Sequence, residues 1–385
     1  MVKSVYIHIP FCQQICHYCD FTKFFYNEQL VDDYLTALEN EMRTYIPAGK
    51  QSMKTIFVGG GTPTALNHKQ LEKLLKMIDN HFDVHTCEEY SFEANPGDLD
   101  VEKIKLLKSY GVQRISMGVQ VFDDEMLEYI GRLHKIKDVY DNIDSLTRYG
   151  FENISIDLIY SLPNQTMEHF QKTLQEALSF DLPHYSAYSL QIEPKTIFYQ
   201  RYKQGKLPKP PEETEAAMYQ HLMKEMEKHG KIQYEISNFA EPGFESKHNL
   251  TYWNNEHYYG MGAGAHGYLP GKRIVNLRPL PAYVKQANLD GKPVLHTEPI
   301  GRKEEIEEEM FLGLRKRTGV SKEMFRNKFD LEADEIYADA LSTLKSRKWV
   351  VDEGGFIKLT SAGLLFGNEV FQEFLLEDDV TELPR

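Results

Sequence analysis

Short apolar runs alternate with longer amphipathic segments along the first 235 residues. In the segment 29–45, for example, Tyr34, Leu38 and Met42 fall on one face of a helix. Strands that alternate with helices in this way are typical of a parallel sheet. The predicted strands span residues 5–9, 55–58, 90–93, 114–118, 154–160 and 185–192, and the predicted helices span 29–45, 68–81, 101–110, 138–149, 167–180 and 212–229.

Unusual polar residues cluster at the C-terminal ends of these predicted strands. A cysteine-bearing loop follows the first strand, and the glycine-rich segment 59–63 follows the second. Glu93 closes the third strand, Gln120 follows the fourth, and Asp157 lies in the fifth. A barrel brings all its strand ends to one rim, whereas an open sheet brings them together only at a switch point. We therefore expect an α/β fold in which residues 1–235 form a partial (β/α)6, TIM-like barrel.

The strand–helix rhythm is lost after residue 235. Residues 236–300 are rich in glycine, asparagine, histidine and aromatic residues, and we predict a connecting segment there. Residues 301–385 contain three helix-like stretches followed by a short β-like pair around the turn 353–355. This pattern predicts a small, mostly helical, winged-helix-like domain. It could bind DNA or simply pack against the barrel, and its excess of acidic residues favours packing.

Composition and charge narrow the classes of function. The 385 residues contain 44 basic and 58 acidic side chains, for a net charge of −14. An acidic chain is a poor non-specific ligand for nucleic acids, so no nucleic-acid partner is expected. No run of 18 apolar residues is present, and His8 and Pro10 interrupt the N-terminal apolar run. We therefore predict a cytoplasmic protein without a signal peptide or a membrane-spanning segment.

Three of the four cysteines lie within eight residues, as Cys12, Cys16 and Cys19. An odd triplet cannot pair fully in disulfides. A structural zinc site needs a fourth ligand, which Cys87 or His8 could supply. A 4Fe-4S cluster usually takes four cysteines, so three local thiolates would leave one iron open to another ligand. The sequence favours the cluster over zinc and predicts the three clustered cysteines as its ligands.

The segment from Tyr6 to Cys19 resembles the signature of the radical S-adenosylmethionine (SAM) superfamily, in its HemN/HemW variant. The resemblance implies that SAM binds the open iron and that the reduced cluster can cleave it. Taken alone, the glycine run could be a tight turn, and the acidic residues could form buried salt bridges. By resemblance, the residues that contact SAM are Tyr6, Gly60, Gly61, Thr62, Glu93, Gln120, Arg132 and Asp157.

A second motif divides the family into branches. The segment 248–253 resembles the H-N-x-x-Y-W motif of the haem-chaperone branch, which implies a haem site at His248, Asn249, Tyr252 and Trp253. An imidazole can ligate haem iron, and flat aromatics can pack against a porphyrin. Taken alone, His248 would more often be a structural histidine, and His266 and His257 are weaker candidate ligands.

The expected function follows from this branch and from one departure. Members that oxidise coproporphyrinogen III carry a fourth cysteine two residues after the third, where this chain has Phe21. We therefore expect a haem chaperone that delivers haem to haem-requiring respiratory proteins, with a transient membrane association allowed. The alternatives are an oxygen-independent coproporphyrinogen III oxidase and a winged-helix regulator. No catalytic residue is assigned, and enzyme activity is left open.

Overall fold

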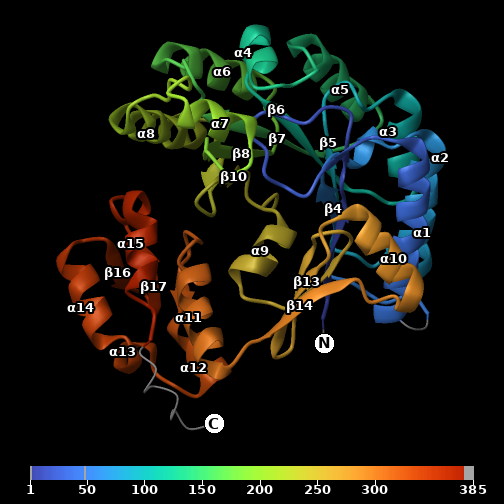
Figure 1. Ribbon diagram of the computed structural model, residues 1–385. Coiled ribbons are helices and arrows are strands. Elements are labelled where there is room, and N and C mark those ends of the chain that lie inside the picture. Colours follow the sequence, from blue (N-terminus) through green and yellow to red (C-terminus); the bar gives the residue numbers. More distant parts are fainter. Residues whose placement is uncertain (1, 47–48, 377–385) are drawn as a thin grey trace.

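The protein is built around one large, curved sheet with helices on its outer side (Figure 1). The computed structural model describes residues 2–46 and 49–376. Neighbouring strands at the centre of the sheet run parallel in chain order, as predicted. These strands are β1 (Ser4–Ile9), β4 (Thr55–Gly60), β5 (Glu89–Ala94), β6 (Arg114–Gln120), β7 (Asn153–Tyr160) and β8 (His184–Ser189).

The two faces of the sheet differ in polarity because side chains alternate along each strand. In β1, Val5, Ile7 and Ile9 are fully buried in the main hydrophobic core, whereas Ser4 and His8 point to the opposite, inner face. Six outer helices pack on the apolar face, namely α1 (Glu28–Tyr45), α2 (His68–His81), α3 (Val101–Ser109), α5 (Ile136–Arg148), α6 (Met167–Ser179) and α8 (Glu212–Lys228). The short helices α4 (Asp124–Tyr129) and α7 (Ile197–Lys203) contribute to a separate apolar cluster that includes Ile159 of β7.

Strands between residues 232 and 299 extend the sheet at both of its ends. The short strands β10 (Asn238–Ala240) and β9 (Ile232–Gln233) add antiparallel strands beyond β8. On the other side, β11 (Tyr258–Met261) pairs in parallel with β1. An antiparallel extension follows from β11, and α10 (Leu280–Asp290) packs on α1. Its strands are β12 (His266–Leu269), β13 (Lys272–Asn276) and β14 (Val294–Pro299).

Helix α9 (Lys247–Trp253) closes the end of the barrel at which the parallel strands begin. The Glu89 carboxylate, at the start of β5, accepts hydrogen bonds from the backbone N–H groups of Lys247 (2.9 Å) and His248 (3.0 Å). A carboxylate at a helix N-terminus satisfies free N–H groups and is favoured by the helix dipole. The hydroxyls of Thr251 and Ser4 lie 3.2 Å apart. The barrel floor is thus formed by β1, β5 and α9, which are distant in sequence.

The C-terminal domain has a hydrophobic core of its own. The predicted hairpin is present as β16 (Val350–Glu353) and β17 (Phe356–Leu359), which β15 (Val320–Ser321) joins at the β17 edge. The fold class predicted from sequence is therefore confirmed. Residues 377–385, at the end of the predicted domain, lie outside the described residues. The domain's helices are α11 (Arg302–Gly313), α12 (Lys322–Phe329), α13 (Ala333–Ile336), α14 (Ala338–Ser346) and α15 (Gly367–Gln372).

Within residues 2–46 and 49–376, none of the helices combines the length and apolar character needed to cross a lipid bilayer.

Candidate functional site

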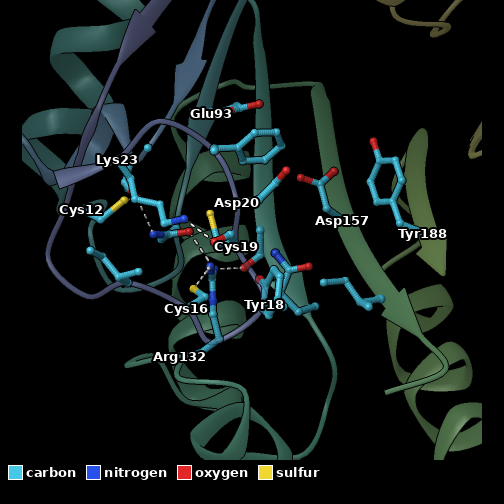
Figure 2. Close-up of a pocket in the computed structure, with 18 of the residues that line it drawn as sticks. Cys12, Cys16, Tyr18, Cys19, Asp20, Lys23, Glu93, Arg132, Asp157 and Tyr188 are labelled. Carbon is cyan, nitrogen blue, oxygen red and sulfur yellow. Dashed lines mark hydrogen bonds between the residues drawn. The ribbon is translucent and has the colours of Figure 1, made fainter. Parts of the chain in front are cut away.

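A cavity of about 420 Å³ opens at the C-terminal ends of the parallel strands. Figure 2 shows the three clustered cysteines together on one side of it and the carboxylates of Glu93 and Asp157 on another. Parallel strands deliver their ends to one rim, so residues far apart in sequence meet here. The predicted residues that line the cavity are Cys12, Cys16, Cys19, Gly60, Gly61, Thr62, Glu93, Gln120, Arg132 and Asp157.

Backbone hydrogen bonds hold the cysteine loop on the rim. The short strands β2 (Phe11–Cys12) and β3 (Phe24–Phe25) pair in parallel and bracket the loop. Inside the loop, the N–H of His17 donates to the carbonyl of Ile130 over 2.9 Å. All three cysteines are free thiols, so the loop presents them to the cavity without a disulfide.

The residues that could complete a zinc site are occupied elsewhere. Both ring nitrogens of His8 make hydrogen bonds, to the Tyr6 hydroxyl (2.8 Å) and the Thr22 carbonyl (2.7 Å). The Cys87 thiol lies near the start of β5 and contacts the carbonyl of Glu89 at 3.1 Å. Among the residues that the structure describes, no three His, Cys, Asp or Glu side chains converge to hold a single metal ion. A cubane differs, because each thiolate binds its own iron. Neither His8 nor Cys87 is therefore placed to complete a zinc site with the three clustered cysteines.

A chain of hydrogen bonds links two of the cysteine sulfurs. The Arg132 guanidinium donates to Cys16 Sγ (3.5 Å) and to Asn95 Oδ1 (2.7 Å). Asn95 Nδ2 donates to Thr62 Oγ1 over 2.9 Å, and the Thr62 hydroxyl donates to Cys12 Sγ over 3.6 Å. Hydrogen bonds and cations near cluster sulfurs stabilise their negative charge. The donor set around the thiols therefore suits an anionic iron–sulfur cluster.

Burial favours the neutral thiol form of Cys12 and Cys19. Burial raises the pKa of Cys12 to about 11, although the hydrogen bond from Thr62 opposes this, and burial also raises the pKa of Cys19. Only a thiolate ligates iron, so loading of the site must displace protons. Nearby cations assist this step, because Lys23 donates to the Cys19 carbonyl and Arg132 contacts Cys16.

Glu93 and Asp157 place two buried carboxyl groups on the cavity wall. Burial raises the pKa of Glu93 to about 7, while a 2.8 Å hydrogen bond from the Gly60 N–H lowers it and the nearby Asp157 raises it further. Burial also raises the pKa of Asp157, whose Oδ1 accepts a 3.2 Å hydrogen bond from Ser116. A cationic ligand would offset the cost of burying these charges. Such a wall suits a ligand that carries a sulfonium and an ammonium group.

The glycine run is required by packing within the protein. A Cβ on Gly59 would lie 2.6 Å from the Glu93 carboxylate, and one on Gly61 would lie 2.8 Å from the backbone nitrogen of Phe11. Gly60 has a φ of +114°, and a Cβ there would collide with the His8 ring. These glycines let β4 approach the cysteine loop closely, which places Thr62 beside Cys12.

Sequence reasoning missed Asn95, which joins Arg132 to Thr62 by hydrogen bonds. The only sequence signal for this residue is an asparagine that precedes a proline at the end of a predicted strand. Tyr6, predicted to contact SAM, is not among the residues that line the cavity. Its hydroxyl binds His8 and its ring stacks on Phe57, with the ring centroids 6.0 Å apart. Tyr6 therefore lies on the inner wall next to the cavity and supports the cysteine loop through His8.

The predicted haem residues lie on α9, in the barrel floor, and do not line the cavity. His248 is 1% exposed, and its Nδ1 and Nε2 each lie 2.8 Å from a hydroxyl, those of Thr55 and Tyr252. Its ring also stacks on Phe57. Burial lowers the pKa of His248 to about 3, so the imidazole stays neutral. In this conformation both ring nitrogens contact hydroxyls of the protein, and the part of His248 in a haem site stays a prediction.

The other motif residues also contact protein groups. The Tyr252 ring packs edge-on against Tyr258 with centroids 4.7 Å apart, and the Arg315 guanidinium lies 4.4 Å from the Trp253 ring centroid. The backbone N–H of Asn249 donates to the N-cap hydroxyl of Ser246. The motif therefore joins the barrel floor to the C-terminal domain.

Comparisons with known proteins match both parts of the chain. Residues 6–177 match the family model described as Radical SAM superfamily, and residues 300–366 match the HemN C-terminal domain. A protein of Bacillus subtilis named "Heme chaperone HemW" is 51% identical over 98% of this chain and 100% of its own length. A protein of the same name from Lactococcus lactis is 46% identical over 98% of both chains.

A solved structure resembles the whole fold. Coproporphyrinogen III oxidase (HemN) from Escherichia coli superposes with a TM-score of 0.84, covering 97% of this chain and 90% of that one. The two sequences are 24% identical, so this likeness describes the architecture alone.

Proposed function

Because this chain belongs to the radical SAM superfamily and, within it, to the family of proteins named Heme chaperone HemW, we propose that it binds haem and delivers it to haem-dependent respiratory proteins. The observation that carries this proposal is the similarity to proteins of that name along nearly the whole chain. In this proposal the protein is cytoplasmic and meets its recipients transiently at the membrane.

The cavity at the strand ends is the proposed site of a 4Fe-4S cluster and SAM. Cys12, Cys16 and Cys19 would hold the cluster, because their free thiols share one cavity with cationic and hydroxyl donors. When bound, the cluster supplies a low-potential electron that can reduce the SAM sulfonium. The proposed SAM contacts are the predicted residues that line the cavity, namely Gly60, Gly61, Thr62, Glu93, Gln120, Arg132 and Asp157.

The residues of the chain have distinct tasks in this proposal. Arg132 and Thr62 fix the orientation of two cysteine sulfurs and balance their charge. Glu93 and Asp157 attract the cationic end of the ligand. Gln120 follows an irregularity in β6 and has a φ of +72°, a strained conformation that the site holds in place. The cavity thus positions a charged ligand beside the cluster loop.

The motif on α9 would need a rearrangement before it could ligate haem. Freeing His248 breaks two buried hydrogen bonds, and each group left unsatisfied costs about 1–3 kcal/mol. The geometry therefore favours a structural role for the motif in the conformation described, and its part in the haem site stays a prediction.

The proposal is tested by haem titration of anaerobically reconstituted protein. We expect a saturable Soret change at one haem per chain, followed by transfer of the haem to haem-depleted respiratory membranes. A linear, non-saturable response, or haem that cannot be transferred, would contradict the chaperone function.

The same sample should be incubated with coproporphyrinogen III, SAM and a reductant. We expect no protoporphyrinogen, because Phe21 lies where the oxidising members carry their fourth cysteine and it lines the cavity with its side chain 66% exposed. Formation of protoporphyrinogen would contradict the chaperone proposal and support the oxidase function.

A further inference from the structure

Two exposed imidazoles lie on the antiparallel extension of the sheet. His266 of β12 and His296 of β14 are both in register with Val275 of the central strand β13, so all three side chains lie on one face. Both histidines are exposed, and within the described residues neither has a hydrogen bond at a ring nitrogen. The ring of His248, by contrast, is buried in the barrel floor and makes hydrogen bonds.

This face continues the inner face of the barrel. Tyr268 of β12 is in register with Tyr258 of β11, which is in register with Ser4 of β1. The Ser4 hydroxyl points inward, because it lies 3.2 Å from the hydroxyl of Thr251 in the barrel floor. His266 is two residues from Tyr268 on the same strand, so its side chain is on the same inner side.

The turn that leads into β12 lies beside the cysteine loop. A Cβ placed on Gly264, two residues earlier, would collide with the Thr22 hydroxyl and lie 3.2 Å from Cγ of Arg278. Thr22 follows Phe21, a large apolar side chain that is 66% exposed. Residues from three separate segments therefore meet at the rim next to the cavity.

The chemistry of these groups matches a haem. A haem requires a neutral imidazole for its iron, cations for its propionates and apolar surface for its ring. The ring of His266 is only partly shielded from solvent, but this partial shielding and the nearby Arg278 lower its pKa, which favours the neutral, ligating form of the imidazole. Arg278 is exposed and makes no ion pair within the described residues. Phe21 offers an exposed aromatic ring one residue before Thr22.

We propose that His266 is the axial ligand of haem iron, that Arg278 pairs with a propionate, and that Phe21 contacts the porphyrin. This assignment rests on the proposed function, because it names the site at which the chain would hold haem. It places the haem beside the cluster loop and leaves the α9 motif in the barrel floor.

Haem titration of the full chain, followed by Soret absorbance, tests the assignment. His266→Ala should bind haem at least about tenfold more weakly and lose the Soret shift, and free imidazole should restore the shift. Arg278→Glu should weaken binding without changing the position of the Soret maximum at saturation. His296→Ala, on the same face, and His85→Ala, an exposed histidine outside this site, are matched controls that should bind as the wild type does.

The outcomes separate the two proposals. Wild-type protein that fails to bind haem saturably would sink the proposed function. Saturable wild-type binding that His266→Ala leaves unchanged would overturn the His266 assignment alone, and loss of the shift in His248→Ala with retained near-ultraviolet circular dichroism would move the ligand to α9.

Discussion

The guanidinium of Arg132 donates a hydrogen bond to the sulfur of Cys16 across 3.5 Å. The same guanidinium reaches Asn95 and, through Thr62, the sulfur of Cys12. One cation therefore orders two proposed cluster ligands of the same loop. Outer hydrogen bonds of this kind orient ligands and tune the metal centre that they hold.

Replacement of Arg132 should lower the reduction potential of the cluster. Reduction adds negative charge, which a cation beside a ligand sulfur stabilises. We expect Arg132→Gln to have a lower midpoint potential than the wild type, and Arg132→Lys to fall between them. Anaerobic redox titration followed by electron paramagnetic resonance measures this order. Equal potentials in all three proteins would show that the guanidinium does not act on the cluster.

The Glu93→Gln variant should bind SAM more weakly. An amide keeps the acceptor for the Gly60 N–H but removes the charge, so we expect affinity at pH 8 to fall by about tenfold. Because the pKa of Glu93 is raised to about 7, wild-type affinity should decline as the pH falls below 7, and that of the variant should not. Equilibrium dialysis with labelled SAM measures both. Ser91→Ala, on the same face of β5, is the control, and equal losses in both variants would refute the role of the charge.

Removal of the His248 ring should destabilise the barrel floor. His248→Ala leaves the Thr55 and Tyr252 hydroxyls without partners and opens a cavity against Phe57. We expect the free energy of unfolding to fall by about 2–4 kcal/mol, measured by urea denaturation. His85→Ala removes an exposed ring and should change it little. A loss below about 0.5 kcal/mol in the His248 variant would contradict a structural role.

Glu41 should make the protein less stable as the pH rises. This carboxyl is fully buried, and it accepts hydrogen bonds from the Gly262 N–H (2.9 Å), Asn276 Nδ2 (2.6 Å) and the Tyr283 hydroxyl (2.5 Å). Burial raises its pKa from 4.5 to about 7 in the folded protein, despite these hydrogen bonds. The stability that Glu41 contributes is therefore fully present below pH 4.5, the pKa of the group in the unfolded chain, and is lost as the pH rises through 7.

Between about pH 4.5 and pH 8, this effect amounts to about 3 kcal/mol at most. Glu41→Gln should flatten that part of the pH dependence in urea denaturation, whereas Glu39→Gln, in the exposed pair with Arg43, should not. An unchanged slope in the Glu41 variant would show that the group does not titrate across this range.

Sequence reasoning succeeded where local patterns fix the structure. The strands that carry Glu93 and Asp157 are continuous and β-rich, and parallel pairing brings their ends to one rim. The comparisons confirm the family that the cysteine loop indicated.

Sequence reasoning could not predict the features that long-range contacts decide. β11 lies beside β1 only because the chain returns across the sheet, and its composition carries no strand period. The orientation of His248 depends on Thr55 and Glu89, almost 200 and 160 positions earlier in the chain. A motif shows which residue types are present, and only the fold shows which neighbours their atoms face.

The central claim is that Cys12, Cys16 and Cys19 hold an iron–sulfur cube at the rim of the barrel. Its most direct test is the iron, sulfide and zinc content of protein reconstituted anaerobically. The account predicts about four iron and four sulfide per chain, both lost when the three cysteines are replaced by serine. Stoichiometric zinc in the wild type, or iron and sulfide retained by the triple variant, would contradict it.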